Sequence, residues 1–138
     1  MIVTNEEQLR IQSEPFTGTE EELSNLIKVL EFELELCENP GVGLAAIQIG
    51  IPVQVGIIRT EEIGLDLVNT KIVSCSEMVK LREGCLSFPG QFIDVYRMHT
   101  ITMDNKDGEI MEISGFIAQA VQHEVDHFSG LTMFDRRV

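Results

Sequence analysis

The segment His123-Glu124-Val125-Asp126-His127 combines residue types that can bind a metal ion and activate water. On an α-helix, residues four apart share one face and lie about 6 Å apart along the axis, so both imidazoles can reach one divalent ion. Glu124 is rotated by about 100° from His123 and can contact water on the ion without becoming a ligand. Asp126 falls on the opposite flank, where it can orient a ligand histidine or pair with an arginine.

The alternative is that two surface histidines happen to fall four apart. Context argues against it, because the pair lies on the apolar side of an expected helix, where unliganded imidazoles would need other partners. The third ligand is expected upstream, since the residues that directly follow His127 offer no good ligand. We predict Cys85, in the turn-like segment 83–90, because a thiolate is a strong ligand that a metal keeps deprotonated. Three protein ligands leave a coordination position for water, which is typical of a catalytic site.

The glycine-rich segment GVGLAAIQ at residues 41–48 fits the dinucleotide-binding pattern G-x-G-x-x-A. That pattern requires a strand before it and a helix after it, whereas here a helix is expected to precede and a strand to follow. We therefore favour an extended segment whose glycines let another backbone approach closely, with Gln48 offering an amide N–H at its end.

Two helices and several strands are expected to position these residues. The first helix runs from Glu20 to Glu38, begins with a capping box of Thr19 and Glu22, and stops at 39–41. Its apolar stripe consists of Leu23, Leu26, Ile27, Leu30, Leu34 and Cys37. The second helix, from Gly115 to Ser129, ends before a capping glycine. Its expected inward residues are Phe116, Ile117, Ala120, Val121, His127 and Phe128.

Strands are expected at 52–60 and 71–75, an extended stretch at 86–97, and a hairpin over 99–113 with its turn at 105–108. His99 is expected at the surface. The order of elements predicts an α+β fold, with mostly antiparallel β-sheets around a central C-terminal metal-binding helix and one N-terminal amphipathic helix.

The composition suits one globular domain over residues 1–138, since 43% of the chain is apolar. A net charge of −13 disfavours nucleic-acid partners, and no apolar run approaches the roughly 20 residues that span a bilayer. The N-terminus lacks the pattern of a secretory signal. An odd number of cysteines then favours free thiols in the cytoplasm, with Cys37 and Cys75 as buried apolar residues.

Three segments resemble the peptide deformylase family, which carries G-Φ-G-Φ-A-A-x-Q, E-G-C-Φ-S and H-E-x-D-H in this order. Here they read GVGLAAIQ at 41–48, EGCLS at 83–87 and HEVDH at 123–127. The resemblance covers roughly residues 14–135. It implies a hydrolase of protein biosynthesis that removes the N-formyl group from N-formylmethionyl peptides or nascent proteins and releases formate.

The resemblance also implies roles for individual residues. Cys85, His123 and His127 would hold one divalent ion, Fe²⁺ physiologically, with Zn²⁺, Ni²⁺ or Co²⁺ as substitutes. Glu124 would act as general base and then as general acid. The Gln48 side chain and the Leu86 backbone N–H would stabilise the oxyanion, and the Gly43 backbone would pair with the peptide as an added strand. Glu83 and Arg97 match a structural ion pair, and the methionine pocket matches Val42, Leu81, Phe116 and Ala120.

The sequence departs from the family pattern in two places, and these limit which family properties we expect of this chain. Gln119 stands near the pocket where the family usually has an apolar residue, so the methionine preference is expected to change. The chain ends soon after the metal-binding helix and lacks the helical tail of bacterial relatives, so we do not expect ribosome docking. We expect a monomer in the cytoplasm, or in the host cytoplasm if the source is a virus. A metallo-peptidase and a non-catalytic formyl-peptide-binding protein are the alternative functions.

Overall fold

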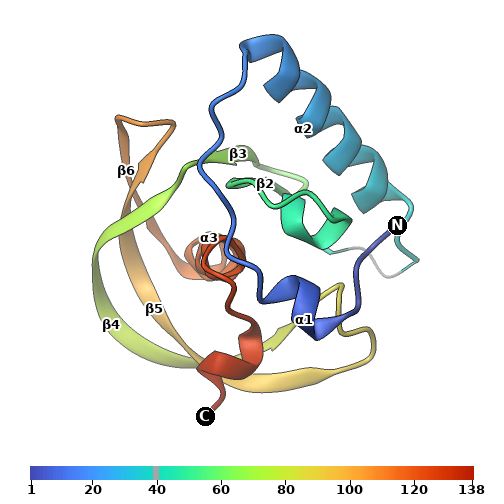
Figure 1. The fold of residues 1–138 in the computed structure, drawn as a ribbon. Coiled ribbons are helices and arrows are strands. Elements are labelled where there is room, and N and C mark those ends of the chain that lie inside the picture. The colour runs from blue at the N-terminus through green and yellow to red at the C-terminus, as the bar shows by residue number, and fades with distance from the viewer. Residues whose placement is uncertain (39–40) are drawn as a thin grey trace.

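Two three-stranded antiparallel sheets surround the helix α3 in the computed structural model, which describes residues 1–38 and 41–138 (Figure 1). The first sheet has the order β1-β2-β3, with β1 at Gly43–Ala45, β2 at Val55–Arg59 and β3 at Gly64–Val68. The second has the order β4-β5-β6, with β4 at Lys71–Gly84, β5 at Phe92–Asn105 and β6 at Glu109–Ser114. Helix α3 spans Gly115–Phe128, so the fold is of the predicted α+β class.

Helix α2 (Glu20–Glu35) covers the first sheet and begins at the predicted residue. The Thr19 hydroxyl accepts from the Glu22 N–H, and the Glu22 carboxylate accepts from the Thr19 N–H, both at 3.1 Å. Four leucine and isoleucine side chains bury its inner face: Leu26, Ile27, Leu30 and Leu34. The helix ends three residues before the predicted end, and the expected stop at 39–41 lies partly outside the described residues.

Strands β4 and β5 form a long hairpin, and the turn at its closed end, residues 85–91, contains Cys85. The two strands pair from Lys71↔Asp104 to Gly84↔Phe92, so β4 is much longer than the predicted strand at 71–75. The stretch 86–97 is not extended throughout, because Phe88 N donates to Cys85 O and Gln91 N to Phe88 O, closing turns before β5. The β5–β6 hairpin is confirmed, with positive φ at residues 106–108 of its turn.

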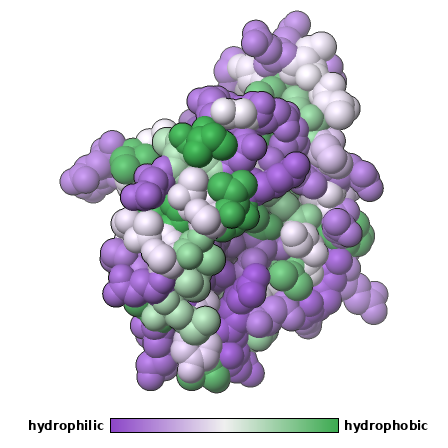
Figure 2. Space-filling model, turned by 90° about the vertical axis from the view of Figure 1, so that its left-hand side faces the viewer, coloured by the Kyte–Doolittle hydropathy of each residue, from purple (hydrophilic) through white to green (hydrophobic). Residues whose placement is uncertain are grey.

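The exposure of the first half of β4 explains why the sequence predicts a strand that is too short. Residues 73–78 are exposed on both faces of this edge strand, so the sequence shows no alternation of buried and exposed positions. Seen from the side of this sheet, apolar side chains interrupt a mostly hydrophilic surface (Figure 2). The exposed apolar residues of the three strands include Val73, Met78, Tyr96, Ile110 and Met111. Cys75 is also exposed, and Cys37 only partly buried, so the prediction of two buried cysteines is wrong.

Helix α3 packs its apolar side into the core between the two sheets. Ala118, Ala120, Val121 and Phe128 are buried there beside Ile58, Leu67 and Ile101. Phe116 does not belong to this face: it lies in the first turn and is 56% exposed, contrary to the prediction. The short helices α1 (Glu6–Leu9), η1 (Ala46–Ile49) and η2 (Met133–Arg136) were not predicted. No helix within the described residues is long and apolar enough to cross a membrane.

Candidate metal centre

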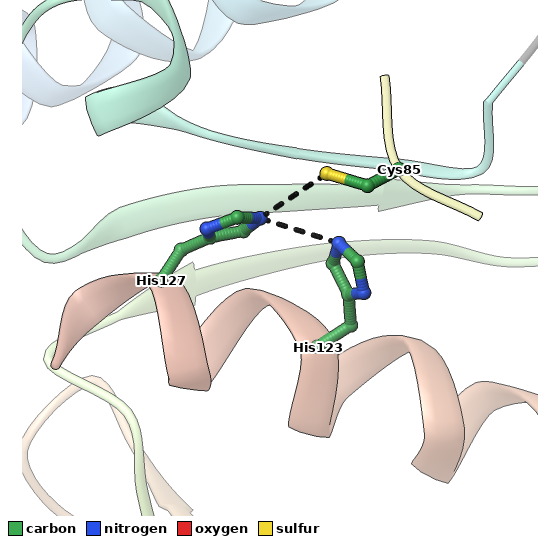
Figure 3. Close-up of side chains that lie close together, drawn as sticks. All are labelled: Cys85, His123 and His127. Carbon is green, nitrogen blue, oxygen red and sulfur yellow. Dashed lines mark hydrogen bonds between the residues drawn. The ribbon is translucent and has the colours of Figure 1, made fainter. Parts of the chain in front are cut away.

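Three side chains from two parts of the chain converge on one point between α3 and the β4–β5 turn. His123 and His127 project from the same face of α3, and Cys85 reaches them from the residue after β4 (Figure 3). The two Nε2 atoms lie 3.2 Å apart, and Cys85 Sγ lies 3.6 Å from His127 Nε2. All three ligand atoms lie within 4.8 Å of one another.

These separations fit a single tetrahedral ion. Ligand bonds of about 2.0–2.1 Å to nitrogen and 2.3 Å to sulfur place two nitrogens about 3.3 Å apart and sulfur about 3.6 Å from nitrogen. The separations of His127 Nε2 from His123 Nε2 and from Cys85 Sγ agree with those values. One thiolate and two imidazoles form a donor set suited to zinc or iron. Three donors would leave one position for water or substrate.

A chain of charged side chains, buried at Glu83, Arg97 and Asp126, lies behind His123. The Glu83 carboxylate accepts from His123 Nδ1 at 2.8 Å and from Arg97 Nε and Nη2 at 3.0 and 2.7 Å. Arg97 Nη1 donates to Asp126 at 2.5 Å, and Arg136 makes a bidentate pair with the same carboxylate at 2.9 and 3.0 Å. The predicted Glu83–Arg97 pair is confirmed, and Asp126 pairs with arginines rather than orienting a ligand histidine.

This arrangement fixes which nitrogen of His123 faces the site. Since Nδ1 is bound to Glu83, Nε2 points to the shared position, as is usual for a histidine that ligates a metal. Burial opposes charge on His123, but contacts with Cys85 and Glu83 outweigh it and raise the pKa. Burial and the neighbouring His123 lower the pKa of His127 well below its ordinary value. A neutral His127 is ready to act as a ligand without losing a proton first.

Glu124 is buried and lines the same cavity as Cys85 and His123. Its side chain is only 3% exposed, and Oε1 has no hydrogen-bond partner within the described residues. Burial is the largest influence and raises the pKa of Glu124 to about 7. A carboxyl group with such a pKa can take up and release a proton near neutral pH.

Gly43 makes room for this carboxylate. A Cβ at Gly43 would lie 2.5 Å from Glu124 Oε2 and 3.0 Å from Ile58 Cδ1. The glycine therefore admits a side chain of α3 at this position.

Gln48 is held rigidly in the wall of the site and is 1% exposed. Its Oε1 accepts from the Ala45 N–H at 2.9 Å, which turns the amide nitrogen outward. That nitrogen lies 3.1 Å from Ser87 Oγ and 3.5 Å from Cys85 Sγ. The donor N–H groups of Gln48 thus face the position next to the ligand atoms.

A cavity of about 610 Å³ opens onto these groups. Most of the predicted substrate-binding residues line it: Val42, Gly43, Phe116 and Ala120, together with Gln48 and Leu86. Leu81 is not among the described residues that line it. Phe88, Phe92 and Gln119 also line the cavity, although no motif in the sequence indicates them as binding residues. Phe88 lies in the turn between β4 and β5 and Phe92 begins β5, so both reach the cavity through a long-range feature without a sequence signal.

The buried donor set, the adjoining carboxylate and the cavity define a metal-dependent hydrolase. The whole chain, residues 1–138, matches the family model described as polypeptide deformylase. The chain therefore belongs to the peptide deformylase family, whose members remove N-formyl groups from nascent peptides.

Individual relatives agree with this assignment. The peptide deformylase of Aquifex aeolicus is 36% identical over 99% of this chain and 85% of its own length. The crystal structure of the Thermotoga maritima peptide deformylase superposes with a TM-score of 0.88 at 31% identity, covering 100% of this chain and 97% of that one. A probable peptide deformylase from Synechococcus phage S-SSM7 gives a TM-score of 0.86 at 35% identity, covering 99% and 98%.

Proposed function

We propose that this chain hydrolyses N-formylmethionyl peptides with one divalent ion held by Cys85, His123 and His127. The observation that carries this proposal is the agreement of the Sγ and Nε2 separations with a three-ligand tetrahedral site. We take Fe²⁺ as the physiological ion and Zn²⁺, Ni²⁺ or Co²⁺ as substitutes, a choice that rests on family resemblance. When bound, the ion lowers the pKa of a water molecule and polarises a carbonyl group.

Glu124 is proposed to move the proton in this reaction. Its free Oε1 and its pKa of about 7 support a role in which it takes a proton from the attacking water and passes it to the departing amine. Glu124 carries one proton from water to the amine, and the second comes from the formic acid as it ionises, so the products are formate and a peptide with a protonated N-terminal methionine amine.

Gln48 and the backbone N–H of Leu86 are proposed to stabilise the negative charge on the formyl oxygen. The buried Gln48 carbonyl oxygen is held by the Ala45 N–H, which fixes the amide nitrogen on the side of Cys85 and supports this role. One donor of this kind is typically worth about 3–4 kcal/mol.

The peptide is proposed to bind along β1 as an added strand. β1 lies at the edge of its sheet, and Val42 and Gly43 line the cavity, so backbone groups there can pair with an extended substrate. Val42, Phe116 and Ala120 would then contact the methionine side chain. Leu81 is left out of this pocket because it does not line the cavity.

We further propose that the chain acts as a monomer in the cytoplasm. Free cysteines throughout the described residues suit a reducing compartment. The net charge of −13 disfavours nucleic-acid partners.

A formate-release assay on a formylmethionyl tripeptide tests the function. The metal-loaded protein should release formate without internal cleavage of the peptide, which separates it from a metallo-peptidase and from a protein that only binds. We expect Glu124→Gln to lower kcat by about 10²–10⁴-fold, since the variant keeps the shape but loses the base. Turnover retained in that variant would remove Glu124 from the mechanism.

A further inference from the structure

Gln119 connects the wall of the cavity to the buried charges behind His123. It lies on α3 one turn before His123, is 9% exposed and lines the cavity. Its amide nitrogen donates to Glu83 Oε1 at 3.2 Å and lies 3.4 Å from the Arg82 carbonyl. A polar side chain thus occupies a cavity position for a structural reason that the sequence did not reveal.

The donor from Gln119 completes the hydrogen bonding of the Glu83 carboxylate. An ionised carboxylate offers about four acceptor positions. Arg97 Nε and Gln119 fill Oε1, whereas Arg97 Nη2 and His123 Nδ1 fill Oε2. Gln119 and His123 line the cavity, but Arg97 does not. Without the Gln119 amide, Glu83 Oε1 would keep Arg97 Nε as its donor and lose the one on the cavity side.

We propose that Gln119 is a positioning residue for the metal centre, acting through Glu83 on His123. Its amide holds the Glu83 carboxylate in the plane that accepts from His123 Nδ1, so that His123 Nε2 stays aimed at the ion. This inference rests on the proposed metal site. Partners that orient a ligand histidine typically contribute 10–100-fold to metal affinity. Gln119 is one hydrogen bond further from the ligand histidine than Glu83, so we expect a contribution to metal affinity at the lower end of that range, about tenfold.

Three variants isolate this contribution. Gln119→Leu keeps a similar volume but removes the donor, and Gln119→Met does the same with an unbranched side chain if the leucine variant does not fold. Gln122→Leu is the matched control on the same helix. The Gln122 amide bonds the backbone of Met98 at 2.8 and 2.9 Å, and no contact of its side chain with Glu83 is found.

The experiment is a Co²⁺ titration of the metal-stripped proteins against a competing chelator, followed by absorption spectroscopy. We expect Gln119→Leu to bind Co²⁺ about tenfold more weakly with shifted ligand-field bands, and Gln122→Leu to match the wild type. Equal affinity and identical bands in Gln119→Leu and the wild type would overturn the inference. So would an equal loss in both variants, which would indicate a general effect on α3. A wild-type protein without a thiolate-to-cobalt band would instead overturn the metal site itself.

Discussion

Gly43 offers a perturbation of the proposed base that leaves every metal ligand in place. In the variant Gly43→Ala, the new Cβ would lie 2.5 Å from Glu124 Oε2, where real contacts essentially never fall below 3.0 Å. The carboxylate must therefore retreat by at least about 0.5 Å, because β1 is fixed by its pairing with β2.

The size of the effect follows from that displacement. A misplacement of about 1 Å near the chemistry can lower the rate about 100-fold, so we expect kcat to fall between about 10-fold and 100-fold. Stability should change by less than about 1 kcal/mol, since the atom that moves is the end of a flexible side chain. Metal affinity should not change, because Glu124 is not a ligand.

The assay is formate release at saturating substrate, together with metal content and thermal unfolding. Gly64→Ala in β3 is the control, because the nearest atom to its added Cβ is 3.7 Å away and belongs to the side chain of Arg59. A folded, metal-loaded Gly43→Ala protein with wild-type kcat would refute the reasoning that Glu124 is positioned against Gly43.

Three further predictions concern the buried charges and the ion. Arg97→Leu removes the buried cation that Glu83 and Asp126 share, leaving Glu83 with His123 and Gln119 and Asp126 with Arg136. It should lower the free energy of unfolding by about 3–5 kcal/mol in urea titrations. A neutral result would contradict the network. Burial raises the pKa of Glu83, but His123 and Arg97 outweigh it and lower the value from 4.5 to about 2. The contribution of Glu83 to the free energy of unfolding should be complete above pH 4.5 and be lost as the pH falls towards 2. The metal-stripped variant Glu83→Gln should lack this pH-dependent contribution. The same pH profile of stability in the variant and in the metal-stripped wild type would exclude it. With iron, oxidation of Cys85 should inactivate the enzyme in air faster than with Ni²⁺, so equal lifetimes would count against a thiolate ligand.

The sequence predicts those parts of the site that depend on local spacing. The two imidazoles share a face because helical geometry puts residues four apart in register, and the capping box of α2 is likewise a local pattern. The β5–β6 turn was predictable for the same reason, since Asp107 and Gly108 tolerate the positive φ that they adopt.

Features that depend on long-range pairing were not predictable in this way. The full length of β4 comes from pairing with β5, while its exposed outer half carries no periodic signal. The contacts of Asp126 with Arg136 and of Glu83 with Gln119 join segments that only the fold brings together. Phe116 has the helical spacing of a core residue, but the first turn of α3 faces the cavity.

X-ray absorption spectroscopy at the zinc edge, on protein loaded with one equivalent of Zn²⁺, tests the proposed ion site most directly. The account predicts one sulfur at about 2.3 Å and two imidazole nitrogens at about 2.0–2.1 Å, with a light atom completing the shell. A spectrum without the sulfur contribution, or with a single imidazole, would contradict joint ligation by Cys85, His123 and His127.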